Sequence, residues 1–197
     1  MTNPNNSDLE PLTRVQILVV MGVTALILLM VAKVWQKLDS VTLLPWELSF
    51  QAILWGLGLA LLIILSSSLI YRLWPAYRHS ADSYLELVLK PLTWSDLIWL
   101  GLLPGLSEEL LFRGVMLSAL GLNLGALIIS SCIFGILHMS GSQQWPYAIW
   151  ATIVGLMLGY AALITNNLLV PIIAHIVTNI CSSLLWKMGN KLGFPSN

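Results

Sequence analysis

The chain has 197 residues, of which 57% are hydrophobic and only 9% are charged. Soluble domains carry roughly 25% charged residues, so a water-soluble protein of this composition would lack the polar surface to cover itself. Nine basic residues balance nine acidic ones, which excludes the basic surface that a nucleic-acid partner requires. The two cysteines, Cys132 and Cys181, lie in apolar runs, a position typical of buried free thiols rather than a disulfide or a metal site.

The N-terminal part predicts a polar tail, two membrane spans and a loop. After the tail of residues 1–14, an apolar run from Val15 to Trp35 is long enough to span a bilayer and too long for a signal-peptide core. A second span runs from about Leu48 to Trp74. The polar segment 75–95 is expected to be an aqueous loop with room for a short interfacial helix.

The rest of the chain is apolar almost to its end, with three polar or glycine-rich breaks. We therefore expect an all-α polytopic membrane protein of about six transmembrane helices, with a polar site in the bundle core. The last four helices are expected near residues 97–120, 124–139, 146–164 and 168–187. The predicted division is residues 1–14 as tail, 15–92 as two spans and a cytoplasmic loop, 93–187 as catalytic core, and 188–197 as C-terminal tail.

Loop charges predict the orientation in the membrane. With six spans, both chain ends share one face, and that face carries most of the basic residues: Arg14, Arg72, Arg78, Lys90, Lys187 and Lys191. The opposite face carries only Lys33 and Lys37. Because cytoplasmic loops are enriched in Lys and Arg, both termini are expected in the cytoplasm. The expected location is a bacterial or organellar inner membrane.

Three charged residues interrupt the third apolar segment: Glu108, Glu109 and Arg113. Three central charges cost roughly 7–10 kcal/mol on the insertion scale, more than the roughly 4–7 kcal/mol that the segment's large apolar residues return. Neighbouring helices must therefore supply partners. Glu109 and Arg113 are four residues apart and can pair along one helix face. Glu108 is rotated by about 100° and needs another partner.

A surface position for these charges is the alternative interpretation. The run Leu103 to Ser107, which contains Pro104 and Gly105, predicts a helix break, and Ser107 could then be an N-cap with two ordinary first-turn acids. The distances to the polar ends of the segment, about 18 and 22 Å along a helix, instead favour a position near mid-membrane. A helix broken inside a bilayer is typical of functional cavities.

Two histidines and an asparagine lie in the following helices, with His138 and Asn179 about 22 and 20 Å from one membrane face and His175 only about 13 Å from it. His138 lies fifteen residues beyond Asn123, and Glu108 lies fifteen before it, so an antiparallel hairpin places their side chains level. His175 and Asn179 share a helix face at i and i+4. Each histidine alone is better explained by helix packing. Together with a mid-membrane glutamate pair, these residues indicate a functional site.

The set permits hydrolysis of an amide by an activated water. Glu108 and His138 could activate the water, while His175 and Asn179 donate hydrogen bonds to the oxyanion, each worth roughly 3–4 kcal/mol. A serine nucleophile is disfavoured because Ser107 lies in no Gly-x-Ser-x-Gly or Ser-Lys arrangement. A zinc site remains an alternative because Glu and His are permissible ligands, although no His-Glu-x-x-His motif is present.

Three motifs in order resemble those of the CPBP family, which comprises CaaX prenyl endopeptidases and bacteriocin-processing or Abi-type intramembrane proteases. The sequence matches EExxxR at Glu108, Glu109 and Arg113, FxxxH at Phe134 and His138, and HxxxN at His175 and Asn179. The resemblance covers about residues 93–187. The first two spans carry no signature of the family.

The resemblance implies a role for each motif residue. Glu108 with His138 would activate water, and His175 with Asn179 would stabilise the oxyanion. Glu109 and Arg113 would organise the site, with Phe134 packed beside it. The family implies a metal-independent glutamate protease with no cofactor. Its substrate would be a membrane protein, a peptide or a lipidated peptide within the lipid bilayer. Two alternatives remain: a non-catalytic scaffold or immunity protein, and a transporter or proton pathway.

Overall fold

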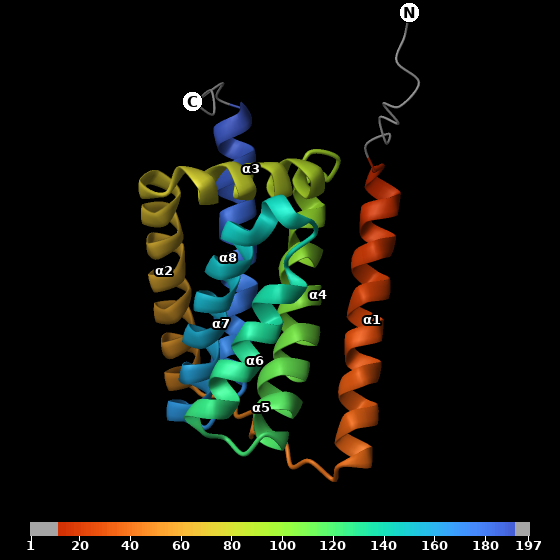
Figure 1. Cartoon of the computed structure of the whole chain (residues 1–197), viewed down its shortest axis with the longest axis vertical. Coiled ribbons are helices and arrows are strands. Elements are labelled where there is room, and N and C mark those ends of the chain that lie inside the picture. The colour runs from red at the N-terminus through yellow and green to blue at the C-terminus, as the bar shows by residue number, and fades with distance from the viewer. Residues whose placement is uncertain (1–11, 192–197) are drawn as a thin grey trace, which may run out of the picture.

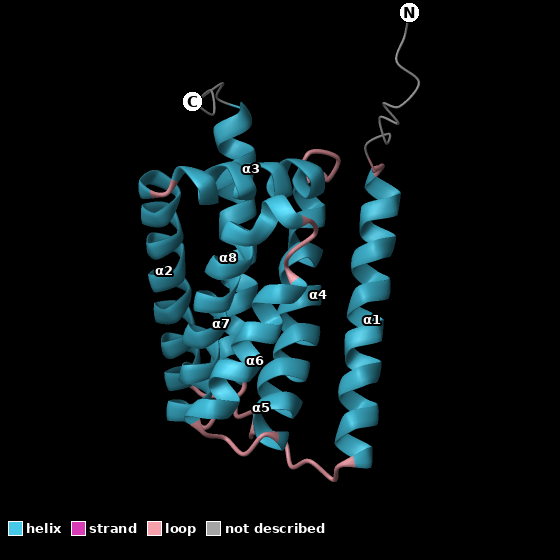
Figure 2. Ribbon diagram, viewed as in Figure 1, coloured by secondary structure: helices cyan, strands magenta, loops and turns pink. Residues whose placement is uncertain are grey.

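The computed structural model describes residues 12–191, which form a helical bundle without strands in that range (Figure 2). The elements in chain order are α1 (Arg14–Leu38), α2 (Phe50–Leu73), α3 (Pro75–Leu89), the 3-10 turn η1 (Trp94–Asp96), α4 (Leu97–Glu109), the π-helix η2 (Leu110–Met116), α5 (Leu117–Ala119), α6 (Leu124–Leu137), the 3-10 turn η3 (Ser142–Gln144), α7 (Trp145–Thr165) and α8 (Leu169–Lys191).

The long helices run side by side, and α3 lies across one end of the bundle (Figure 1). Helices α4, η2 and α5 form one continuous column, so six columns correspond to the six predicted segments. Among residues 12–191, four helices are long and apolar enough to cross a membrane: α1, α2, α7 with its preceding turn, and α8. Helix α6 is a shorter apolar helix. The all-α polytopic architecture is therefore confirmed.

The polar segment after α2 forms a helix of 15 residues rather than an open loop. Pro75 begins α3 at the first helical position, where its missing N–H is not needed. Both the start of α1 and the end of α8 lie at the end of the bundle that α3 covers (Figure 1). Helix α8 continues four residues past the predicted boundary at residue 187. The predicted tail of residues 1–14 falls mostly outside the described residues.

The predicted helix break at Leu103 to Ser107 is wrong. Pro104 lies inside α4, and the Ser107 hydroxyl donates to the Leu103 carbonyl at 2.7 Å instead of capping a new helix. In apolar surroundings the backbone must satisfy its own hydrogen bonds, so the helix continues through the proline. The departure from α-helical geometry occurs later, at η2.

The two cysteines are free, as predicted, but they are not buried. Cys132 is exposed on α6 and Cys181 is partly exposed on α8. Their apolar neighbours in sequence mislead because a helix in a membrane presents apolar residues outward to lipid as well as inward to its partners.

Helices α4 and α8 approach closely through small residues. A Cβ atom at Gly101 would lie 2.9 Å from the Ile176 carbonyl oxygen, and one at Gly105 would lie 3.2 Å from the Ile176 amide nitrogen. A small-x-x-x-small pattern of this kind lets membrane helices pack backbone to backbone. The close approach brings Glu109 on α4 to His175 on α8.

We predict that Gly105→Val separates α4 from α8. The added side chain meets the Ile176 side chain and backbone, and overpacking of this kind typically destabilises a protein by about 1–3 kcal/mol. The measurement is thermal unfolding of the purified protein in detergent. Gly58→Val on α2 is the matched control, because a Cβ atom there meets nothing within 4 Å. Equal unfolding midpoints for the two variants would contradict this account of the packing.

An ion pair ties the beginning of α1 to the bundle. Arg14 Nε and Nη2 donate to the two Asp96 carboxylate oxygens at 2.7 and 2.8 Å. The Thr93 backbone N–H and hydroxyl both donate to Asp96 Oδ2 at 2.7 Å. The Arg14 hydrogen bond, with those from Thr93, holds the pKa of Asp96 well below its usual range. Helix α1 buries few residues, so this ion pair is a main restraint on the position of the helix.

The tie is expected to persist in mild acid. A carboxyl group whose pKa is lowered by folding stabilises the fold at every pH above its unfolded pKa of about 3.9, and this contribution is lost only as pH falls through the lowered value. Hydrogen exchange of the first turns of α1, corrected for intrinsic rates, should therefore show equal protection at pH 7 and pH 5. Asp96→Asn should reduce protection at both values. Loss of protection in the wild-type protein between pH 7 and pH 5 would refute the assignment.

Candidate active site

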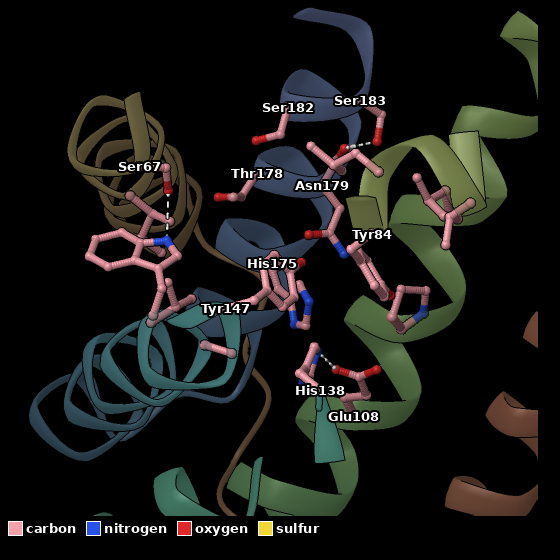
Figure 3. Close-up of a pocket in the computed structure, with 18 of the residues that line it drawn as sticks. Ser67, Tyr84, Glu108, His138, Tyr147, His175, Thr178, Asn179, Ser182 and Ser183 are labelled. Carbon is pink, nitrogen blue, oxygen red and sulfur yellow. Dashed lines mark hydrogen bonds and ion pairs between the residues drawn. The ribbon is translucent and has the colours of Figure 1, made fainter. Parts of the chain in front are cut away.

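A cavity of about 180 Å³ lies inside the bundle beneath α3. Four of the predicted site residues line it: Glu108 from α4, His138 at the end of α6, and His175 and Asn179 from α8 (Figure 3). Phe134 lines it as well. The other two predicted residues, Glu109 and Arg113, lie behind the wall of the cavity, with side-chain exposures of 0% and 1%. The structure thus brings together groups from three separate helices.

Glu108 and His138 face one another without a direct hydrogen bond. The distance from His138 Nε2 to Glu108 Oε2 is 3.8 Å, which is too long for a hydrogen bond. His138 Nδ1 lies 2.8 Å from the Phe134 carbonyl oxygen, so Nδ1 carries the proton and Nε2 is an acceptor in the neutral ring. Glu108 Oε2 is buried and has no hydrogen-bond partner. Two facing acceptors at this distance suit a donor with two hydrogens, such as a water molecule.

Glu109 joins Arg113 to His175. Its Oε1 atom accepts from Arg113 Nη1 and from His175 Nδ1, both at 2.7 Å. Arg113 Nη2 also donates to the Gly155 carbonyl oxygen at 3.1 Å. The predicted Glu109–Arg113 pair is therefore present, but the bond to His175 was not predicted. Residue spacing could not show which of two adjacent glutamates faces α8.

Phe134 packs between the charged and imidazole groups. The Arg113 guanidinium carbon lies 4.4 Å from the centroid of its ring, within range of a cation–π interaction. The His138 ring lies 4.5 Å and the His175 ring 6.1 Å from the same ring, centroid to centroid. Phe134 thereby fixes the spacing of the two histidines.

A π-helix follows the two glutamates directly. Segment η2 begins at Leu110 and contains Arg113, and its residues from Leu111 onward are buried. Single π-helical turns inside longer helices are found frequently at functional sites. The residue pattern did not indicate the π-helix. The pairing of Glu109 with Arg113 that an α-helix predicts is present despite it.

Tyr84 and Tyr147 are cavity residues that the sequence analysis missed. Both line the cavity (Figure 3), and their rings stack with centroids 4.8 Å apart. Burial, together with the nearby charge of Glu108, raises the pKa of Tyr84 to about 12, so its phenol is a hydrogen-bond donor at neutral pH. Tyr84 could have been found only by knowing that α3 folds back over the bundle.

Two further hollows, each about 310 Å³, reach the same glutamate. One lies between α1, α3 and α4 and has a mainly apolar lining that includes Ile17, Met21 and Leu28. The other lies between α1, α4 and the end of α6. Glu108 and Tyr84 line all three hollows. Helix α1, which carries no family motif, thus forms a wall beside the site.

The described residues offer no group of three or more His, Cys, Asp or Glu side chains placed to hold a metal ion. His175 is bonded to Glu109, while His138 faces Glu108. The two histidines therefore serve different carboxylates, whereas a zinc site needs them to converge on one point.

The helical bundle defines a polytopic membrane protein with a cavity between its helices, lined by both polar and apolar side chains. Residues 90–181 match the family model described as type II CAAX prenyl endopeptidase Rce1-like, and this part of the chain, which holds all three motifs, is similar to that family. The Bacillus subtilis (strain 168) protein YpbD, described as uncharacterized, is 29% identical over 133 residues, which are 67% of this chain and 68% of YpbD. No solved structure matches the chain significantly.

Proposed function

We propose that this protein is an intramembrane endopeptidase that hydrolyses a peptide bond of a membrane-embedded or lipidated, CaaX-like substrate. The observation that carries the proposal is the pair of facing acceptors on Glu108 and His138, 3.8 Å apart in a cavity within the bundle. The match of residues 90–181 to the Rce1-like family model supports a CAAX-type protease activity.

In the proposed reaction, the water held by Glu108 and His138 attacks the carbonyl carbon of the scissile bond. Its proton passes to Glu108 as the C–O bond forms. Collapse of the tetrahedral intermediate breaks the C–N bond, and the proton goes from Glu108 to the leaving amine. The products are a carboxylic acid and an amine, and no covalent enzyme intermediate forms.

His175 and Asn179 would stabilise the oxyanion. In its doubly protonated form, His175 keeps Nδ1–H on Glu109 and presents Nε2–H to the substrate. The Asn179 amide supplies a second donor from the same face of α8. Each donor in such a site is worth about 3–4 kcal/mol. Glu109 and Arg113 act as positioning residues because they hold His175 without lining the cavity.

The three hollows that meet at Glu108 support an amphiphilic substrate. The hollow between α1, α3 and α4 has a mainly apolar lining, which suits an apolar chain or a lipid group. The main cavity has a more polar lining, which suits a peptide. The excess of Lys and Arg at the α3 end of the bundle supports a position of this end, with both termini, at the cytoplasmic face. The substrate would then reach the site from that face or laterally from the bilayer.

The test is cleavage of a defined peptide by the purified protein in proteoliposomes. The substrate is a quenched fluorescent peptide ending in a farnesylated cysteine and three further residues, and a second peptide lacks the farnesyl group. Cleavage that depends on Glu108 supports the proposal. Cleavage that survives Glu108→Gln overturns it. A comparison of the two peptides shows whether the lipid is recognised.

A further inference from the structure

The main cavity is lined by hydroxyl groups that the proposed reaction does not use. Thr178 and Ser182 on α8 and Ser67 on α2 all line the cavity. The Thr178 and Ser182 hydroxyls point away from Asn179, toward the side where Ser67 lies (Figure 3). His175, Thr178 and Ser182 follow one another at i, i+3 and i+7, which places them on one face of α8. The hydroxyl row therefore continues the site from His175 toward the α3 end.

Thr178 and Ser182 differ from most of the other hydroxyl residues in helices. Six of those donate to the carbonyl oxygen four residues earlier in their own helix, at 2.6–3.0 Å: Ser68, Ser83, Ser107, Thr152, Thr165 and Ser183. Thr178 Oγ1 is buried and has no hydrogen-bond partner. The hydroxyl of Ser182, a partly exposed residue, makes no hydrogen bond within residues 12–191. Helical serine and threonine in apolar surroundings satisfy themselves at little cost, so a buried, unsatisfied threonine hydroxyl on a cavity wall requires a reason.

An unpaired hydroxyl is not by itself a sign of a ligand. Ser118 and Ser131 are also buried without partners, but neither lines the main cavity. The Thr178 hydroxyl has no partner, and Thr178 lines the main cavity. On the opposite wall, Ser67 accepts from Trp150 Nε1 at 3.1 Å, which holds its oxygen in place and leaves its own hydrogen for a ligand.

We infer that Thr178 and Ser182, with Ser67 opposite, form a subsite that binds the main chain of an extended peptide beside the scissile bond. The inference rests on the proposed function. Residues four apart on a helix are separated by about 6 Å along its axis. Main-chain groups on one side of an extended peptide repeat every 6.6–6.8 Å or so. A peptide lying along α8 can therefore meet both hydroxyls with successive groups of one edge.

The chemistry of the wall favours a neutral, hydrogen-bonding ligand. A hydroxyl both donates and accepts, so it can pair with either the N–H or the C=O of a peptide. No Lys or Arg lines the cavity, although such cations are what a lipid phosphate would require. Because main-chain groups are common to all peptides, the subsite would contribute affinity without selecting side chains.

The test separates binding from chemistry with the farnesylated peptide in proteoliposomes. We expect Thr178→Val and Ser182→Ala each to raise KM by about threefold to tenfold, the worth of one neutral hydrogen bond, with kcat within twofold of wild type. Thr165→Val and Ser68→Ala are the matched controls, because each removes a hydroxyl that is already bonded within its helix and neither residue lines the cavity. The thermal midpoint of Thr178→Val should be equal to or above that of wild type, since a buried unpaired hydroxyl is removed.

Two results would overturn the inference. The first is an unchanged KM in the Thr178→Val/Ser182→Ala double variant. The second is a loss of kcat together with a lowered thermal midpoint, which would show a structural role. Binding of the uncleaved peptide to Glu108→Gln protein, with and without the double variant, keeps the two proposals distinguishable. Hydroxyl-dependent binding without wild-type cleavage supports the subsite and refutes the protease. Cleavage with an unchanged KM refutes the subsite alone.

Discussion

Glu108→Gln is expected to lower the cleavage rate by a factor of about 10²–10⁴, the range typical of losing a general base. Glutamine keeps the size of the side chain but cannot accept the proton of the attacking water. Because Glu108 Oε2 has no hydrogen-bond partner and is not part of the Glu109 network, the fold should be unaffected. The measurement is kcat for the farnesylated peptide, with the thermal midpoint as the check on folding.

Glu47→Gln is the matched control for this variant. Glu47 lies in the loop between α1 and α2, where its backbone pairs with Asn167, and it lines none of the three hollows at Glu108. The control should therefore cleave at the wild-type rate. Wild-type cleavage by a well-folded Glu108→Gln protein would instead show that a base other than Glu108 acts, whereas absence of cleavage by the wild-type protein would favour the scaffold alternative.

Glu109→Gln, the same substitution at the residue next to Glu108, is expected to destabilise the protein by about 3–5 kcal/mol. Removal of the carboxylate leaves Arg113 as an uncompensated charge at 1% exposure, and breaking a buried ion pair in this way is strongly destabilising. His175 also loses the acceptor of its Nδ1–H. The measurement is unfolding in detergent, read as the shift in free energy of unfolding.

The exposed pair of Glu86 and Lys90 on and beside α3 is the control for the buried one. Their side chains are 60% and 72% exposed at a separation of 2.9 Å, and pairs of this kind contribute little to stability. Glu86→Gln should therefore have the same free energy of unfolding as the wild-type protein. If Glu109→Gln proved as stable as Glu86→Gln, the buried network would not be what holds α4, α7 and α8 together.

Counting residues from the turn at Asn123 predicted the relative depth of Glu108 and His138 well. Glu108 and His138 are equally far from the turn at Asn123, and a regular rise per residue was enough to place them level, as the distance of 3.8 Å shows. The same arithmetic left His175 nearer the membrane surface than the glutamates. The structure brings it to Glu109 because Gly101 and Gly105 let α8 approach α4.

Features that depend on tertiary contacts could not be predicted. The continuation of α4 through Pro104 follows from the need to satisfy backbone hydrogen bonds in lipid, and the residue pattern alone suggested a break. Tyr84 joins the site only because α3 lies across the bundle. The catalytic roles of Glu108, His138, His175 and Asn179 stay predictions that the variants above address.

The bonds around Glu109 also bear on how the protein is made. The carboxylate meets Arg113 within its own helix, but Gly155 follows Arg113 by 42 residues and His175 follows Glu109 by 66. A ribosome must therefore add 66 residues after Glu109 before the last partner is made. Until α7 and α8 are in place, the buried pair of Glu109 and Arg113 lacks the hydrogen bonds to Gly155 and His175, so the site is completed only when the last helix packs.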